Sequence, residues 1–151
     1  MRALTTYIVE DSPLIRDSLI ATLEELGPVR VVGSADDEAS ALQWLAGPGP
    51  RADLLIVDLF LKSGSGLGVL AATRAHRHPA GQPAQAGPSP RPGQQVVVLS
   101  NYATPAMREK CLALGADRVF DKSHDIEALL AFCTELAQRL DTVGDDPGAA
   151  V

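Results

Sequence analysis

Acidic residues follow two short segments that are rich in β-branched and aliphatic side chains. Glu10 and Asp11 come directly after Thr5–Val9, and Asp58 comes directly after Leu54–Val57. Carboxylates gathered in one place repel each other by ~4 kcal/mol per pair at about 4 Å and an effective dielectric of ~20. Such a cluster needs compensating cations, and Mg²⁺ suits oxygen ligands of this kind. These residues predict a magnesium pocket if the fold brings the two segments together.

A hydroxyl and an ammonium group follow two further segments of the same kind. Ser100 comes directly after Gln95–Leu99, and Lys122 lies just beyond Arg118–Phe120. Beside Mg²⁺, a lysine offsets negative charge on phosphoryl oxygens, and a serine hydroxyl donates a hydrogen bond to one of them. An aspartate in these surroundings is suited to nucleophilic attack on phosphorus. The predicted chemistry is transfer of a phosphoryl group to Asp58, assisted by Lys122 and Ser100.

The elements that would position these residues alternate between short strands and amphipathic helices. This alternation is typical of a parallel sheet covered by helices on both faces. The predicted strands are Thr5–Val9, Val29–Gly33, Leu54–Val57, Gln95–Leu99 and Arg118–Phe120. We therefore predict a doubly wound α/β fold with five parallel strands and five helices. In the flavodoxin-like strand order 2-1-3-4-5 the first and third strands are neighbours, so the residues that follow them meet at the carboxyl edge of the sheet.

Helix boundaries are marked by capping residues. Ser12 and Thr104 are each followed by proline, which is the usual pairing of an N-cap with the first helical position. Gly27 and Gly115 stand where helices commonly stop. The apolar residues predicted to be buried are Ile15, Leu19, Leu23 and Leu26 in the first helix and Ile126, Leu129, Leu130, Cys133, Leu136 and Leu140 in the last.

Two segments fall outside this pattern. Residues 78–94 contain five prolines and one charged residue, and they predict a Pro/Gly-rich loop inserted at the amino-terminal edge, away from the pocket. Residues 141–151 are small and acidic and predict a disordered tail, which leaves residues 1–140 as the single domain. The start lacks the pattern of a secretory signal, and no apolar run approaches ~20 residues, so we expect a cytoplasmic protein that stands alone and does not enter a membrane.

Charge and cysteine content exclude other classes of function. The net charge of −6, without a cluster of Lys and Arg, argues against direct binding to nucleic acid. Cys111 and Cys133 stand singly in helical patterns and predict buried, reduced thiols. The histidines, His76, His78 and His124, lack the spacing of metal ligands.

Two other kinds of enzyme or nucleotide site fit the sequence less well. A phosphatase of the haloacid dehalogenase type needs a second acid two residues after its aspartate, and that position is Phe60. Gly64, Gly66 and Gly68 miss the dinucleotide-binding fingerprint and are better explained by a turn and the start of the third helix. The remaining alternative is a module that keeps the fold but acts through protein interaction without phosphorylation.

Four segments in this order, YIVEDS, LLIVDLFLKSGSG, VVVLSNYA and VFDKS, resemble the response-regulator receiver domain of two-component signalling. The resemblance covers roughly residues 4–140 and implies that Asp58 is the phosphoacceptor. It implies Mg²⁺ ligation by Asp11, Asp58 and the backbone carbonyl of Phe60, with Glu10 acting through water. The phosphoryl donor would be a sensor histidine kinase or a histidine phosphotransfer protein of a phosphorelay. Any catalysis would be limited to the protein's own phosphorylation and dephosphorylation.

The resemblance also assigns a switch. Lys122 would contact the phosphoryl group, Ser100 would be the switch hydroxyl and Phe120 the switch aromatic. Their movement would remodel the face made by the fourth helix, the fifth strand and the fifth helix, and this face would signal to a downstream protein.

The sequence departs from the family pattern beside the pocket. Asn101 stands where Ala or Gly is common, and Lys62 stands where proline is common. Phe60 and Tyr102 add bulky rings on either side of Asp58. We therefore expect slow self-dephosphorylation, because the rings impede an attacking water molecule.

Overall fold

The computed structural model describes residues 3–47, 52–61, 63–77, 94–101 and 103–144. Within these ranges, strands and helices alternate along the chain. They are β1 (Leu4–Val9), α1 (Pro13–Leu26), β2 (Val29–Ala35), α2 (Glu38–Ala46), β3 (Leu54–Val57), α3 (Gly66–Arg77), β4 (Gln95–Ser100), α4 (Pro105–Ala113), β5 (Arg118–Asp121) and α5 (Ile126–Gly144). The strands form one parallel sheet in the order β2-β1-β3-β4-β5. The predicted fold and strand order are confirmed.

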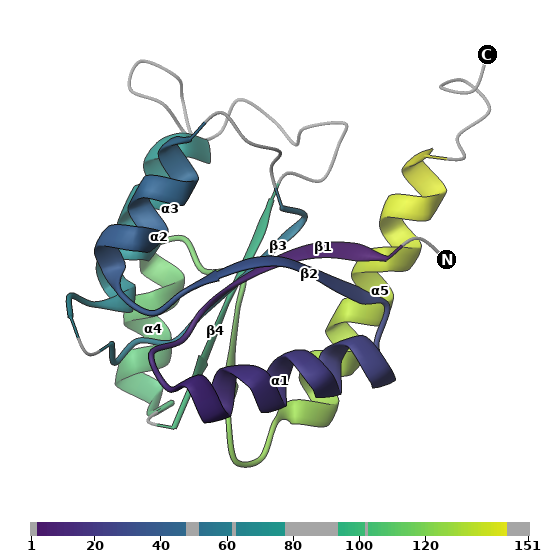
Figure 1. The fold of residues 1–151 in the computed structure, drawn as a ribbon, viewed down its shortest axis with the longest axis horizontal. Coiled ribbons are helices and arrows are strands. Elements are labelled where there is room, and N and C mark those ends of the chain that lie inside the picture. The colour runs from purple at the N-terminus through teal and green to yellow at the C-terminus, as the bar shows by residue number, and fades with distance from the viewer. Residues whose placement is uncertain (1–2, 48–51, 62, 78–93, 102, 145–151) are drawn as a thin grey trace.

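Two apolar cores lie on the two faces of the sheet. Helices α1 and α5 cover one face, and α2, α3 and α4 cover the other (Figure 1). The first core includes Leu23 and Leu129, and the second includes Val69 and Cys111. All four residues of β3 are buried, as expected for a central strand that is covered on both sides. Both cores therefore hold the central strands in place beneath the carboxyl edge.

Capping side chains begin the helices where the sequence predicts them. The hydroxyl of Ser12 accepts a hydrogen bond from the Ile15 N–H at 3.3 Å, and the hydroxyl of Thr104 accepts one from the Met107 N–H at 3.2 Å. The N–H of Gly27 donates to the Leu23 carbonyl at 2.9 Å where α1 ends. These bonds satisfy backbone groups that have no partner inside the helix.

The prediction that α1 buries four apolar residues is wrong at two of them. Leu19 and Leu23 are buried, whereas Ile15 is 39% exposed and Leu26 is 67% exposed. The four residues share one helical stripe, but only the middle of the helix packs on the sheet, and its two ends extend beyond the core. In α5 the corresponding prediction holds for Leu129, Cys133 and Leu136, which are buried, whereas Ile126, Leu130 and Leu140 are half-buried and pack against the same core.

The two cysteines are free and buried, in agreement with the sequence. Burial raises the pKa of the Cys133 thiol to about 12 and also raises the pKa of the Cys111 thiol. Both groups therefore remain protonated and unreactive at neutral pH.

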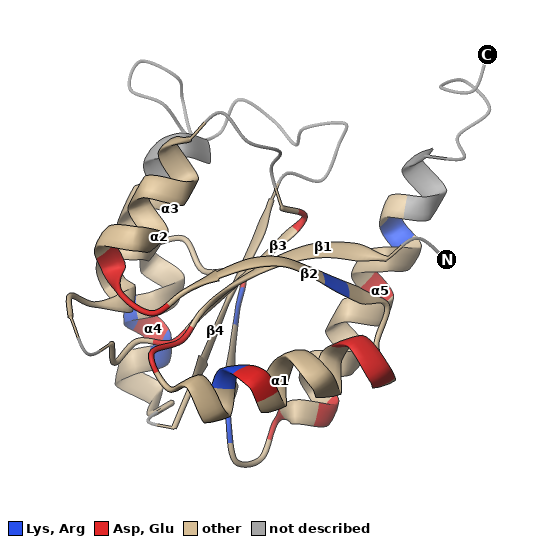
Figure 2. Ribbon diagram, in the orientation of Figure 1, with Lys and Arg blue, Asp and Glu red and all other residues tan. Residues whose placement is uncertain are grey.

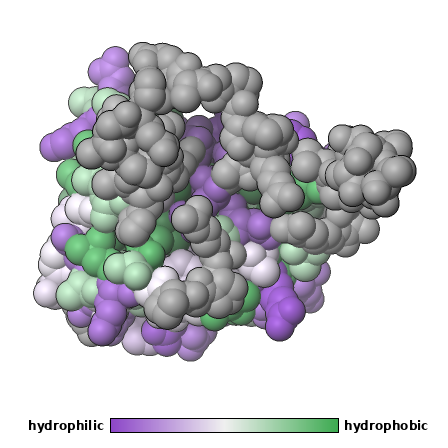
Figure 3. All heavy atoms as spheres, turned by 90° about the horizontal axis from the view of Figure 1, so that it is seen from above, coloured by the Kyte–Doolittle hydropathy of each residue, from purple (hydrophilic) through white to green (hydrophobic). Residues whose placement is uncertain are grey.

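The two irregular segments lie largely outside the described residues. For the predicted insertion at 78–94, the structure describes only Gln94, whose side-chain amide donates to the Ala52 carbonyl at 3.1 Å. Helix α3 ends and β4 begins at the same edge of the sheet, and Figure 3 views the molecule from this side. Helix α5 continues to Gly144, four residues into the predicted tail 141–151, and residues 145–151 lie outside the described part. No helix among the described residues is long and apolar enough to cross a membrane.

Stability should depend on the middle of α1 and not on its exposed apolar residues. Replacing the fully buried Leu23 by alanine should lower the free energy of unfolding by about 2–5 kcal/mol, because it leaves a cavity in the core. Leu14 is 81% exposed, so Leu14→Ala should change stability by at most ~0.5 kcal/mol. Urea unfolding of both variants measures the difference. Equal losses would show that the exposed end of α1 packs on the protein in solution.

Candidate functional site

The pairing of β1 with β3 brings the acidic residues together. Val9 lies opposite Val57 in the parallel ladder, so Glu10 and Asp58 leave the sheet side by side. Carboxylate oxygens of Glu10, Asp11 and Asp58 all lie within 4.8 Å of one another. The short acidic segment between β1 and α1 is visible in Figure 2. The predicted convergence of the three acids is therefore present.

Lys122 provides the positive charge of this cluster. Its Nζ donates to both oxygens of Glu10, at 3.0 and 3.1 Å, and to Oδ2 of Asp58 at 3.1 Å. All three side chains are nearly enclosed, with exposed fractions of 12% for Lys122, 3% for Glu10 and 8% for Asp58. The backbone N–H of Lys122 donates to the Ser100 carbonyl at 3.1 Å, which ties the turn after β5 to the end of β4.

The charges at this edge do not balance without a further cation. Three carboxylates and one ammonium give a net charge of −2 when all four groups are ionised. Burial, and then the neighbouring Asp58 carboxylate, raise the pKa of Glu10 from its ordinary value near 4.5 to about 7, against the opposing effect of Lys122. Burial alone would lower the pKa of Lys122, but the two carboxylates outweigh it and hold that pKa above its ordinary value. The donor set therefore fits a divalent cation, whose binding would favour the ionised form of Glu10.

The backbone orients Asp58 from two sides. Its own N–H donates to the Val9 carbonyl at 2.9 Å, and the N–H of Phe60 donates to its Oδ1 at 3.3 Å. Lys122 holds Oδ2, so both carboxylate oxygens have a donor. The Phe60 side chain is 52% exposed, which places its ring at the surface beside the pocket, as the sequence suggests.

Ser100 and Phe120 lie on opposite faces of the sheet. Ser100 is fully buried, and alternation along β4 places it on the same face as Val98, which packs with α2, α3 and α4. Phe120 belongs to the other core and packs on Phe132 of α5 with ring centroids 6.0 Å apart. The side chain of β5 on the Ser100 face is Val119. The role of switch aromatic assigned to Phe120 does not fit this position, because its ring is already part of the α1–α5 core.

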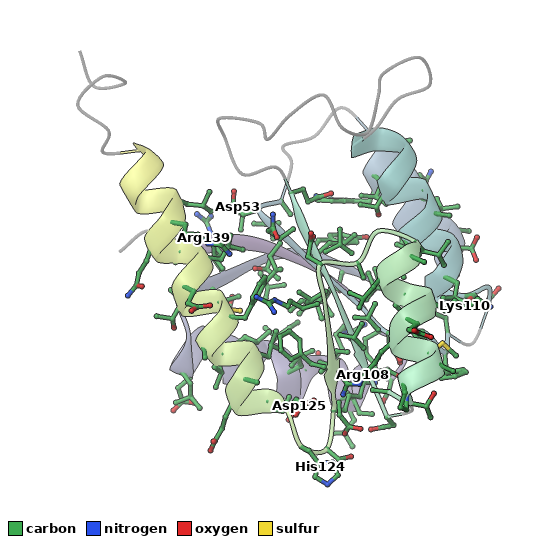
Figure 4. The ribbon with its side chains drawn as sticks, turned by 180° about the vertical axis from the view of Figure 1, so that it is seen from behind. Asp53, Arg108, Lys110, His124, Asp125 and Arg139 are labelled. Carbon is green, nitrogen blue, oxygen red and sulfur yellow. The ribbon has the colours of Figure 1, made fainter. Side chains whose placement is uncertain are left out.

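A network around Arg108 joins the elements next to Ser100. From α4, the Arg108 guanidinium donates to the carbonyls of Ala103 at 3.0 Å and Val119 at 2.9 Å, and it reaches a carboxylate oxygen of Asp125 at 3.4 Å (Figure 4). Asp125 also accepts the N–H of Asp121 at 2.9 Å. Arg108 thus connects α4, β5 and the start of α5, a contact that no sequence motif indicated.

An open groove of about 380 Å³ lies beside the pocket. Leu14 and Ile15 of α1 line it together with Ile126 of α5, and Asn101 and Lys122 lie at its wall. Asn101 is exposed, whereas Lys62 and Tyr102, the other two departures from the family pattern, lie outside the described residues. The exposed apolar residues Leu14 and Ile15 of α1 therefore lie next to the acidic cluster.

The chain belongs to the response regulator receiver domain family, because the sequence model of that family matches residues 6–134. The chain is 30% identical over 107 residues to the probable transcriptional regulatory protein NarL of Mycobacterium tuberculosis, and these residues cover 71% of this chain and 42% of NarL. The chain therefore spans less than half of the length of that relative. It is the receiver domain of a two-component response regulator.

Solved structures share the fold at lower sequence identity. The receiver domain of the putative response regulator NarL from M. tuberculosis superposes with a TM-score of 0.66 and 23% identity, covering 96% of this chain and 99% of that one. A LuxR-family DNA-binding response regulator from Staphylococcus aureus gives 0.67 and 19%, covering 91% and 98%. A response regulator from Burkholderia pseudomallei, solved with a phosphorylated aspartic acid, calcium ion and citrate, gives 0.65 and 24%, covering 95% and 75%.

Without metal, the pocket should make stability depend on pH through Glu10. Its pKa is higher in the folded than in the unfolded state, so its contribution is complete below about pH 4.5 and is lost as pH rises towards 7. Between about pH 5 and pH 7.5 in chelator, Glu10→Gln should gain on the order of 1–3 kcal/mol relative to the parent. Urea unfolding at both pH values measures this gain. The exposed Glu25→Gln in α1 is the control, and a pH-independent difference for Glu10→Gln would contradict the prediction.

Proposed function

We propose that this receiver domain takes a phosphoryl group from a histidine kinase or a histidine phosphotransfer protein onto Asp58, in the cytoplasm and with Mg²⁺. The contact of the Lys122 ammonium with both Glu10 and Asp58, inside a pocket of three acids, carries the proposal. An ammonium fixed against the Asp58 carboxylate, with further carboxylate oxygens at the same edge, supports both nucleophilic attack by Asp58 and binding of a divalent ion. A related fold, that of the B. pseudomallei regulator, was solved with a phosphorylated aspartic acid and a calcium ion, which supports the same chemistry here.

In the proposed transfer, a carboxylate oxygen of Asp58 attacks the phosphorus of a phosphohistidine. The new O–P bond forms as the N–P bond breaks, and the imidazole nitrogen leaves with the electron pair. Because Lys122 already contacts Asp58, its ammonium group is close enough to stabilise the negative charge on the oxygens of the transferred phosphoryl group. Asp11, Asp58 and the Phe60 carbonyl, with Glu10 acting through water, would hold Mg²⁺, which would supply the remaining positive charge.

The groove beside the pocket suits the approach of the phosphoryl donor. A donor histidine must come close to Asp58, and its protein then covers the rim of the pocket. Leu14 is 81% exposed on that rim and has no packing role in the fold, which is the character of an apolar contact residue.

The proposed output surface is the face of α4, β5 and α5. Ser100 lies at the end of β4 and its carbonyl accepts the Lys122 N–H, so a change at the phosphoryl group acts directly on this strand end. Arg108 then ties the segment after β4 to β5 and to Asp125. In the proposal, Ser100 starts the change and the Arg108 network carries it to the surface where a downstream protein binds.

Phosphorylation is tested directly with a small phosphodonor. Incubation with acetyl phosphate and MgCl₂ should add the mass of one phosphoryl group to the intact protein. Asp58→Asn should abolish the addition, and Lys122→Ala should reduce its rate by roughly 10²–10³-fold through loss of charge stabilisation. Intact mass spectrometry follows the reaction, with the exposed Asp17→Asn in α1 as the control acid. If the parent gains no mass at any MgCl₂ concentration, the domain acts as an interaction module without phosphorylation.

Metal binding is tested separately from phosphorylation. Mg²⁺ at tenfold above its dissociation constant should stabilise the folded state by roughly 1.4 kcal/mol, which raises the melting temperature by about 3–6 °C. Asp11→Asn should remove most of this shift, because it takes away a charged ligand, whereas Asp17→Asn should keep it. Thermal unfolding in chelator and in MgCl₂ gives the comparison. An unchanged shift in Asp11→Asn would remove that residue from the metal site.

A further inference from the structure

The loop between β3 and α3 carries Asp58 and Phe60, and a single residue of α2, Glu38, forms hydrogen bonds with it. Glu38 is the first residue of α2, and its backbone N–H donates to the Ser63 carbonyl at 3.2 Å. Its carboxylate oxygen Oε1 accepts the backbone N–H of Ser65 at 2.8 Å. One residue therefore holds the loop through both its main chain and its side chain.

Two glycines make room for this carboxylate. Gly64 has a φ of +82°, and a Cβ there would collide with Cβ of Glu38. A Cβ at Gly68 would lie 2.5 Å from Oε2 of Glu38. Gly68 lies in the first turn of α3, where alanine would favour the helix, so glycine at this position is explained by the space that Glu38 needs. The first turn of α3 has no acidic residue of its own, and Glu38 supplies negative charge there from α2.

The contact continues by short steps to the phosphoacceptor. Ser65 forms an antiparallel bridge with Phe60, and the N–H of Gly66 donates to the Leu59 carbonyl at 3.0 Å. The Phe60 N–H in turn donates to Oδ1 of Asp58. A displacement of Ser65 therefore moves the backbone of Phe60, which bears the carbonyl proposed as a metal ligand.

The anchor of this arrangement is the packing of α2 on the sheet. Trp44 of α2 stacks on Tyr7 of β1, with ring centroids 3.9 Å apart and planes inclined by 16°. The N–H of Ser40 donates to the Asp37 carboxylate at 2.8 Å and fixes the start of the helix. Glu38 thus reaches the loop from a base that is fixed to the same sheet as Asp58.

We propose that Glu38 is a positioning residue for phosphoryl transfer, which holds the β3–α3 loop in the geometry that lets Phe60 and Asp58 bind Mg²⁺ together. The inference rests on the proposed function of Asp58. Glu38 is not placed as a metal ligand, and it acts only through Ser65 and Phe60. Residues that orient metal ligands in this way commonly alter metal affinity by 10–100-fold when they are replaced.

The test is the Mg²⁺ concentration that gives half-maximal phosphorylation by acetyl phosphate. Glu38→Ala should raise this concentration by about tenfold while the maximal extent at saturating Mg²⁺ is retained. Glu38→Gln keeps an oxygen acceptor for the Ser65 N–H and should recover most of the loss. Glu24→Ala is the matched control, because the Glu24 carboxylate accepts the Val31 N–H at 3.0 Å in a part of the chain that does not contact the loop.

A double substitution separates positioning from general loss of stability. Gly68→Ala in the parent should shift the Mg²⁺ dependence as Glu38→Ala does, because its methyl group displaces the carboxylate. In the Glu38→Ala protein the same substitution should cause no further shift and should raise the melting temperature, since alanine favours the helix. Additive shifts would overturn the proposal.

The outcomes also distinguish this proposal from the proposed function. Glu38→Ala with the Mg²⁺ dependence of the parent overturns the role of Glu38 while Asp58 phosphorylation stands. If the parent takes no phosphoryl group, the proposed function fails, and the Mg²⁺-dependent rise in melting temperature then replaces phosphorylation as the measure of metal affinity. A parent without either response overturns both.

Discussion

The register in which β1 pairs with β3 is the constraint on which the site depends. Because Val9 lies opposite Val57, the next residue on each strand is a carboxylate, and the two carboxylates cannot move apart without breaking the sheet. Lys122 sits between them, and its reach across the end of β4 requires the order β3-β4-β5. The apolar cores on both faces fix these strands, so the free energy of burial elsewhere holds together charges that repel one another.

The repulsion between the carboxylates makes the empty pocket electrostatically unfavourable. Glu10 is buried with a pKa near neutrality, and the only ammonium that contacts it among the described residues is shared with Asp58. A proton, a divalent ion or a phosphoryl group changes the balance of charge at the same few atoms. Sites of this kind sacrifice some stability of the empty state for responsiveness, and the change spreads because Lys122 and Ser100 are joined through the backbone.

The sequence predicts most of the fold and the acidic site for one reason. In a parallel sheet the residues after the strands share an edge, so Glu10, Asp58 and Lys122 can be gathered from strand positions alone. Prediction of burial from the sequence fails at the ends of α1. Helical periodicity places Ile15 and Leu26 on the apolar face of the helix, but it does not show how far along the helix the packing on the sheet extends.

The contact between the start of α2 and the β3–α3 loop likewise cannot be predicted from hydrophobic periodicity. Glu38 lies 27 positions before its partner Ser65, and only the paired glycines at 64 and 68 hint at a close approach. The misplacement of Phe120 has a similar origin, since adjacent residues of a buried strand are both apolar and their faces are not distinguishable by composition. The start of β4, by contrast, lies at the edge opposite Asp58, because Gln95 pairs with Leu54 at the beginning of β3 and Asp58 follows the end of that strand. In evolutionary terms, a longer connection between Arg77 and Gln95 would cost little loop-closure entropy, because that cost rises slowly with length, and the helix and strand that it joins meet it away from the acidic residues.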